Sequence, residues 1–179
     1  VALMESVIGA LRAGNRPAVP RFDKSRDDRV PESQWLAPPQ PVRIVILEGW
    51  CVGARPEPAD ALAEPVNDLE RLEDADGRWR RHVNDALAGE YRPLFDALDP
   101  LVLLAAPGFD VVYRWRLEQE HKLRARLQAE GGDSSRVMDD AQVARFIAHY
   151  ERVTRHILAE MPGRADELVR LDAQRRAID

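Results

Sequence analysis

The chain has little cysteine, little lysine and no apolar run of membrane-spanning length. Its one cysteine, Cys51, excludes an internal disulfide bond and favours a reducing compartment, so we expect a cytoplasmic protein. The longest apolar run, residues 101–106, is far too short to span a bilayer, and no signal peptide is visible. We therefore expect no contact with a membrane.

A concentrated positive charge is also lacking. The formal net charge is -5, and the 26 basic residues are spread along the chain rather than clustered. This distribution disfavours a nucleic-acid partner, but it leaves room for an arginine-lined pocket that binds a small anion. Hydrophobic residues make up 45% and charged residues 32%, which is typical of a soluble globular domain.

The sequence begins in the middle of a pattern. Val1 is not an initiator methionine, and apolar residues follow helical spacing from the start, at positions 3, 4, 7, 8 and 11. No capping residue precedes them. We interpret the chain as part of a longer protein whose upstream sequence is absent here.

Strand-like and helix-like segments alternate after this first helix. Residues 42–48 predict a strand buried on both faces, bounded by Pro41 and Gly49; residues 101–106 predict a second strand and residues 167–171 a weaker third. The helical segments are residues 66–88, 93–98, 109–129 and a long apolar stripe that begins at a capping box, Asp139 with Gln142. This order predicts an α/β fold with a parallel sheet that helices cover on both faces.

Ligands of such folds bind beyond the carboxyl ends of the strands, which directs attention to Glu48. A carboxylate there could hold magnesium or its bound waters in a phosphotransferase. A polar residue that merely meets solvent at the strand end is an equally ordinary interpretation. The apolar segment before Glu48 and the glycine after it tip the balance slightly toward the functional one.

Two other charged segments are candidates. Residues 21–29 hold seven charged side chains in nine positions and could bind a small hydroxy-acid, although a solvated loop is the usual explanation of such a run. On the helix after the second strand, Arg114 and Arg116 could neutralise charge on a transferring phosphoryl group. The alternative, favoured by spacing alone, is ion pairing on the helix, for example between Arg116 and Glu120.

Five segments taken in order resemble the D-glycerate 3-kinase family, which is of the phosphoribulokinase/uridine kinase type. The resemblance covers nearly the whole chain. The segments are PRFDKSRDDR (20–29), VILEGWCVGARP (45–56), VNDLERLEDADGRWRRHVND (66–85), YRWRLEQEHKLR (113–124) and VARFIAHYERVTRHILAEMP (143–162).

The resemblance implies transfer of the ATP γ-phosphoryl group to the 3-hydroxyl of D-glycerate, with Mg²⁺. It also implies roles for nine residues. They are Glu48 near the metal and in catalysis, Arg114 and Arg116 in catalysis, Asp23, Lys24 and Arg29 at the substrate, and Asp172, Gln174 and Arg175 near the nucleotide.

One feature of the family is absent: the glycine-rich P-loop that ends in Gly-Lys-Ser/Thr does not occur in this chain. The fold that the resemblance implies is therefore a P-loop NTPase-type parallel sheet flanked by helices, without its N-terminal P-loop strand. Residues 1–179 would form the C-terminal part of a single kinase domain. Its parts would be a substrate loop at 20–31, an acidic strand end at 42–50, a lid-like helix at 109–130 and a C-terminal helix and strand at 139–179.

The missing P-loop strand should lie between the strands at 42–48 and 101–106, and ATP binding would depend on that N-terminal segment. We expect this chain alone to be inactive. Two other functions stay open from the sequence. One is a P-loop kinase for another small hydroxylated metabolite. The other is a non-catalytic module whose long helices, from Val66 and from Asp139, bind a protein partner.

Overall fold

The computed structural model describes residues 1–23, 26, 28–133 and 137–178. It contains two compact units, Val1–Gly49 and Trp50–Asp179, and each is considered by itself. No helix in the described part of the chain is long and apolar enough to cross a membrane.

The first unit begins with the helix that the apolar spacing predicts, α1 (Ala2–Arg12). The charged segment that follows contains a short antiparallel hairpin of β1 (Phe22–Asp23) and β2 (Asp28–Arg29), and a 3₁₀ turn, η1 (Glu32–Gln34), comes next. The indole of Trp35 donates a hydrogen bond to the carbonyl oxygen of Val30 at 2.9 Å. This bond closes the turn onto the end of the hairpin.

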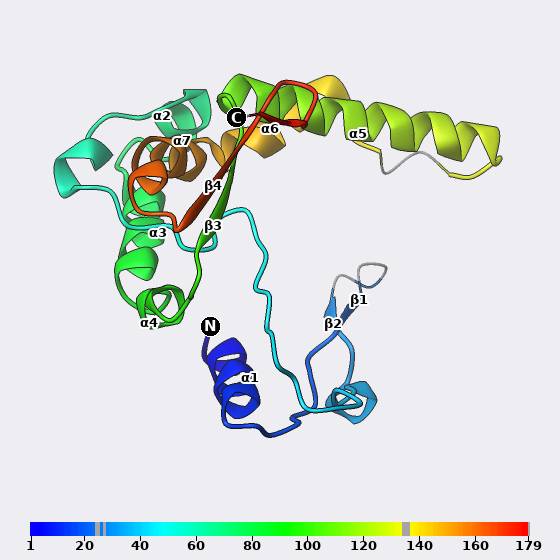
Figure 1. Ribbon diagram of the computed structural model, residues 1–179. Helices are drawn as coiled ribbons and strands as arrows, with labels where there is room; N and C mark the ends of the chain where they lie inside the picture. Colours follow the sequence, from blue (N-terminus) through cyan, green and yellow to red (C-terminus); the bar gives the residue numbers. More distant parts are fainter. Residues whose placement is uncertain (24–25, 27, 134–136, 179) are drawn as a thin grey trace. The chain divides into compact units, whose positions relative to one another are not determined.

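The prediction of a buried strand at residues 42–48 is wrong for this chain. The segment has no regular secondary structure, and its apolar side chains are largely exposed, with Ile46 at 86%. Figure 1 draws it as an irregular trace. A strand requires a neighbour for its backbone N–H and C=O groups. Apolar and β-branched residues show that the segment suits a sheet, but no described strand pairs with it.

The second unit contains the predicted pair of parallel strands. β3 (Val102–Ala105) pairs with β4 (Glu167–Leu171) in parallel, with Val102 opposite Glu167. A third strand that the sequence analysis missed, β5 (Ala177–Ile178), pairs antiparallel with β4. The sheet is therefore mixed, in the order β3-β4-β5, and β3 is one of its edges.

Within the described residues of this unit, six α-helices and two 3₁₀ turns accompany the sheet. They are η2 (Ala59–Leu62), α2 (Asp68–Glu73), α3 (Arg78–Ala88), α4 (Arg92–Asp96), α5 (Phe109–Ala129), α6 (Asp140–Ala148), α7 (Glu151–Glu160) and η3 (Met161–Gly163). The bounds of α5 and the capping box of α6 confirm the sequence prediction. The helix expected at 66–88 is interrupted after α2, where Gly77 adopts a left-handed conformation (φ 67°) that glycine tolerates best.

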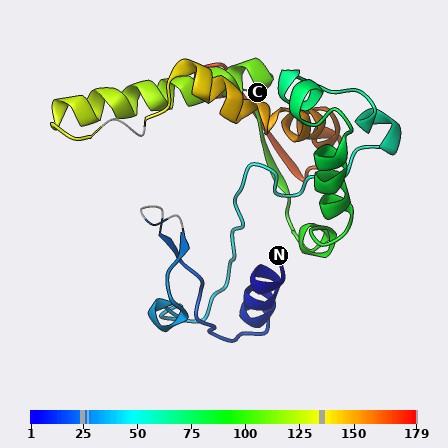
Figure 2. The same ribbon diagram turned by 180° about the vertical axis from the view of Figure 1, so that it is seen from behind.

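The core of this unit lies between the sheet and helices α3 and α7. Leu103 of β3, Leu87 of α3 and Ile157 of α7 are buried together. Helix α6 runs beside α5 in both views of the molecule (Figures 1 and 2), and α5 contacts both α6 and α7. The alternate residues of β3 are not covered, with Val102 51% and Leu104 63% exposed. Within this unit one face of β3 is therefore buried and the other is exposed. The expectation of helices on both faces is met only for the buried face.

Candidate functional site

Glu48 is exposed at the end of the first unit. Its carboxylate makes no hydrogen bond or ion pair with any residue that the structure describes. Two residues further along, Trp50 contacts Tyr150 edge-to-face with ring centroids 4.9 Å apart. The chain is therefore anchored immediately after Glu48, while the carboxylate itself stays open.

An open carboxylate fits the magnesium role that the sequence analysis predicts for Glu48. Mg²⁺ prefers oxygen ligands and in kinases needs only one or two protein carboxylates, because phosphates and waters fill the other positions. In the described ranges no group of three or more His, Cys, Asp or Glu side chains is arranged around a common metal position. The magnesium role of Glu48 stays a prediction.

The predicted substrate residues Asp23 and Arg29 lie on the β1–β2 hairpin, whereas Lys24 lies outside the described residues. In the ladder Asp23 is opposite Asp28 and Arg29 is opposite Phe22. Directly opposed residues share a face, and neighbouring positions alternate between faces. The side chains of Asp23 and Arg29 therefore leave the hairpin on opposite faces. Their contact with one substrate stays a prediction.

The two arginines of α5 have different surroundings. Arg114 is 60% exposed and pairs with Asp110 one turn away at 3.0 Å. Arg116 is more buried and pairs with the buried Glu120 at 2.5 Å, with its guanidinium over the ring of Phe146 at 5.3 Å. The helical ion pair that spacing favoured for Arg116 is confirmed.

Glu120 extends this pairing to the loop before α6. Its other carboxylate oxygen accepts a hydrogen bond from the backbone N–H of Met138 at 3.1 Å, and Arg124 donates to the carbonyl oxygen of the same residue at 2.9 Å. Arg116 thus supports the junction between α5 and α6. Arg114 is the freer of the two guanidinium groups.

The three predicted nucleotide residues form the turn between β4 and β5. Asp172 accepts hydrogen bonds from the backbone N–H of Gln174 at 2.8 Å and of Arg176 at 2.9 Å. The Arg176 backbone bond is the main reason that the pKa of Asp172 lies below its ordinary value, and the Arg176 guanidinium adds to it. This carboxylate is therefore ionised at neutral pH and fixed in the turn.

The same turn is attached to α5. Trp115 donates a hydrogen bond from its indole to the carbonyl oxygen of Ala173 at 2.8 Å. Arg175 lies over the Trp115 ring at 5.3 Å and pairs with Glu118 at 2.8 Å. The structure brings the predicted nucleotide segment and the arginine-bearing helix together. Glu48, Asp23 and Arg29 belong to the other unit, so their closeness to Arg116 remains a prediction.

A buried network of charges that the sequence analysis missed joins α2, α7 and the segment before η2. Arg152 of α7 binds Glu70 of α2 through two hydrogen bonds, of 2.8 and 2.7 Å, and contacts Glu57 at 3.3 Å. Its remaining N–H groups donate to the carbonyl oxygens of Ala61 and Glu64. The Asn67–Glu70 spacing is a capping signal, but no local pattern points to Arg152 as the common partner.

A second buried pair fixes the start of α3. Asp74 accepts hydrogen bonds from the backbone N–H groups of Trp79 and Arg80, and the Arg80 guanidinium lies 3.4 Å from the same carboxylate. Arg80 also donates to the carbonyl oxygen of Leu62 at 2.7 Å. Together the two networks connect α2, α3 and α7 with the segment around η2.

The pH dependence of stability follows from Glu70. Burial raises the pKa of its carboxyl group, but hydrogen bonds from Arg152 and from the backbone of Val66 outweigh it and leave the pKa below the ordinary 4.5. A lowered folded-state pKa gives stability that is complete above the unfolded value and is lost as pH falls through the folded value. We expect the free energy of unfolding to fall below pH 4.5, measured by urea denaturation. Glu70→Gln should flatten that fall, and Glu64→Gln, an exposed control, should not.

The known proteins that are similar to this chain include two named as kinases. The chain is 36% identical over 159 residues to the uncharacterized kinase mug58 of Schizosaccharomyces pombe. The aligned region is 84% of this chain and 53% of that protein. It is 29% identical over 170 residues to the chloroplastic D-glycerate 3-kinase of Arabidopsis thaliana, covering 93% and 34%. A comparison with models of protein families finds no match.

The fold has a solved relative. The structure of D-glycerate 3-kinase from Cryptococcus neoformans superposes with a TM-score of 0.72 at 24% identity, over 99% of this chain and 64% of that one. This agreement shows the α/β fold, with a mixed rather than a purely parallel sheet in the described residues. The chain spans about half or less of the curated relatives it matches. It is a homologue of D-glycerate 3-kinase and of an uncharacterized kinase, and it corresponds to part of these longer proteins.

Proposed function

We propose that the whole protein represented by this chain is a small-molecule kinase, which transfers the γ-phosphoryl group of ATP to the 3-hydroxyl of D-glycerate. The observation that carries the proposal is the similarity to D-glycerate 3-kinase over 93% of the chain. Glu48 would hold Mg²⁺ or its waters, because its carboxylate is exposed and has no partner in the described residues. The ion would neutralise charge between the phosphates during transfer.

Arg114 is the better candidate for direct phosphate contact. Its pairing with Asp110 is exposed at both ends, and such pairs stabilise a helix by only a few tenths of a kcal/mol. The guanidinium can therefore leave Asp110 for a phosphoryl oxygen at little cost. Arg116 would act as a positioning residue, since moving it would leave the buried carboxylate of Glu120 without its partner.

The turn that holds Asp172, Gln174 and Arg175 is proposed to lie near the nucleotide. Its attachment to α5 through Trp115 would place it beside the arginine-bearing helix. Arg29 of the hairpin and Lys24 of the same charged segment are proposed to contact the carboxylate of glycerate, with Asp23 accepting from a hydroxyl group.

A kinase of this kind needs a loop that binds the phosphates of ATP, and another part of the protein would have to supply it. The glycine-rich sequence that supplies backbone N–H groups to the phosphates does not occur in these 179 residues. We expect the isolated chain to show no binding of MgATP at micromolar concentration in isothermal titration calorimetry, whereas the whole protein binds it. Micromolar binding by the isolated chain would refute the dependence on the absent loop.

The acceptor is tested by measuring ADP formation by the whole protein with MgATP and a panel of small hydroxy-acids and sugars. We expect D-glycerate to give the highest kcat/KM. A second candidate, a kinase for another hydroxylated metabolite, is favoured by the higher identity to a kinase that is itself uncharacterized. It would be supported if another acceptor exceeded D-glycerate. Absence of ADP formation with every acceptor would favour the non-catalytic module.

A further inference from the structure

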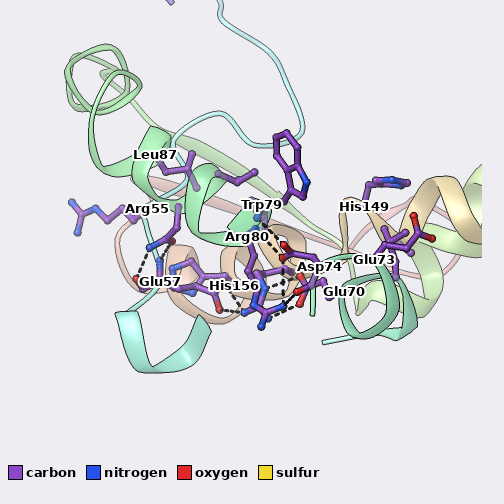
Figure 3. Close-up of a pocket in the computed structure, with 16 residues that line it drawn as sticks. Arg55, Glu57, Glu70, Glu73, Asp74, Trp79, Arg80, Leu87, His149 and His156 are labelled. Atoms are coloured by element: carbon purple, nitrogen blue, oxygen red, sulfur yellow. Dashed lines mark hydrogen bonds and ion pairs between the residues drawn. The ribbon is translucent and has the colours of Figure 1, made fainter. Parts of the chain in front are cut away.

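A cavity of about 390 Å³ lies between α2, α3 and α7, and none of the nine predicted site residues lines it. This volume falls in the range of small-molecule binding sites, which are lined mainly by apolar side chains with a few polar groups. The close-up in Figure 3 shows its walls, with buried ion pairs on one side of the view and Trp79 and His149 on the other.

One wall is an apolar ridge along α3. Trp79, Val83 and Leu87 are spaced by four residues and therefore share one face of the helix. Burial increases along the ridge from Trp79, 64% exposed, to the buried Leu87. Leu69 of α2 and Val153 of α7 continue the apolar lining. The cavity thus has an exposed indole at one end and buried aliphatic side chains at the other.

The acidic side chains of the lining are already engaged. Glu57 and Glu70 bind Arg152, and Asp74 binds Arg80. The fourth acid, Glu73, binds Arg145 with one N–O distance of 2.9 Å. Three arginines line the cavity, the exposed Arg55 with Arg80 and Arg152, and Arg145 binds Glu73 from outside the lining; these four guanidinium groups balance the four acids. Because a ligand charge would have little unpaired charge to meet in the interior, the cavity suits an uncharged molecule.

His149 supplies one open polar atom. Its Nδ1 lies 3.0 Å from the carbonyl oxygen of Arg145, which can only accept, so Nδ1 must carry the proton. In the neutral ring Nε2 is then a hydrogen-bond acceptor. His149 is exposed and lines the cavity, so this acceptor is available to a ligand with an N–H or O–H group.

We propose that this cavity binds an uncharged aromatic or heteroaromatic small molecule that carries one hydrogen-bond donor. Its ring packs on Trp79 and Val83, and its donor faces Nε2 of His149. None of the residues proposed for phosphoryl transfer lines this site, and the proposal does not depend on the chain being a kinase.

The test uses indole as the probe and the ¹⁵N-labelled chain, whose four tryptophans give four indole N–H signals. We expect indole to shift the Trp79 signal saturably at pH 8. The signals of Trp35 and Trp115, which are hydrogen-bonded to backbone carbonyls, should not move. No saturable shift of Trp79, or equal shifts at all four signals, would overturn the proposal.

Matched probes and variants examine each part. The probe 1-methylindole, which has no donor, should bind about fivefold more weakly. Indole-3-acetate should also bind more weakly, and tighter binding would overturn the assignment to an uncharged ligand. Val83→Phe should fill the cavity and weaken indole at least about tenfold. Ala88→Phe adds the same ring at an exposed position of α3 outside the lining and should bind indole as the wild type does. Equal affinity for the two variants would contradict the site.

Discussion

Arg152→Ala is expected to lower the free energy of unfolding by about 3–5 kcal/mol, the range for breaking a buried ion pair from one side. The Arg152 side chain is 7% exposed, and it is the common partner of Glu70 and Glu57. Its removal would leave two largely buried carboxylates without their cation. The carbonyl oxygens of Ala61 and Glu64 would lose donors as well.

Urea denaturation followed by circular dichroism measures this loss. Arg155→Ala is the comparison on the same helix. Arg155 is 59% exposed, pairs with Glu151 one turn away and lies over the Phe109 ring at 5.7 Å, so a smaller loss of about 1 kcal/mol is expected. Arg152→Lys keeps one charge but cannot reproduce the fork of hydrogen bonds, and it should fall between the two. A loss for Arg152→Ala no larger than that of Arg155→Ala would contradict the structural role of the network.

Glu48→Gln in the whole protein is expected to lower kcat by about 10- to 100-fold, on the scale of lost metal-site interactions. The amide keeps the size of the side chain but not the charge that attracts Mg²⁺ or its waters. Glu48 is exposed and has no partner among the described residues, so the change should leave the thermal midpoint unaltered. The Mg²⁺ concentration required for half-maximal activity should rise. This measurement separates a metal role of Glu48 from a general loss of activity.

Glu32→Gln is the control for this experiment, because Glu32 is also an exposed acid of the first unit. It should leave kcat and the Mg²⁺ requirement unchanged. Turnover of Glu48→Gln within about twofold of the wild type would exclude Glu48 from the metal site.

The parts of the fold that local signals specify could be predicted from the sequence. The capping box of Asp139 and Gln142 and the bounds of α5 and β4 were all predicted, since caps, breakers and apolar periodicity act over a few residues. The ion pair of Arg116 with Glu120 was foreseen for the same reason, because the two residues are one helical turn apart.

Features that depend on distant partners could not be predicted. Residues 42–48 have the composition of a strand, but composition records a preference for burial and not the presence of a neighbouring strand. Arg152 meets Glu70 across 82 positions of sequence, and in an otherwise amphipathic helix it resembles any solvated charge. The attachment of the Asp172 turn to Trp115, across nearly 60 positions, is equally invisible to a local pattern.

Phosphorus NMR of the whole protein with MgATP and D-glycerate tests the proposed kinase activity most directly. We expect the γ-phosphorus signal of ATP to disappear while a phosphate-monoester signal with the shift of 3-phosphoglycerate grows in equal amount. Unchanged ATP, or conversion to inorganic phosphate alone with glycerate intact, would contradict it.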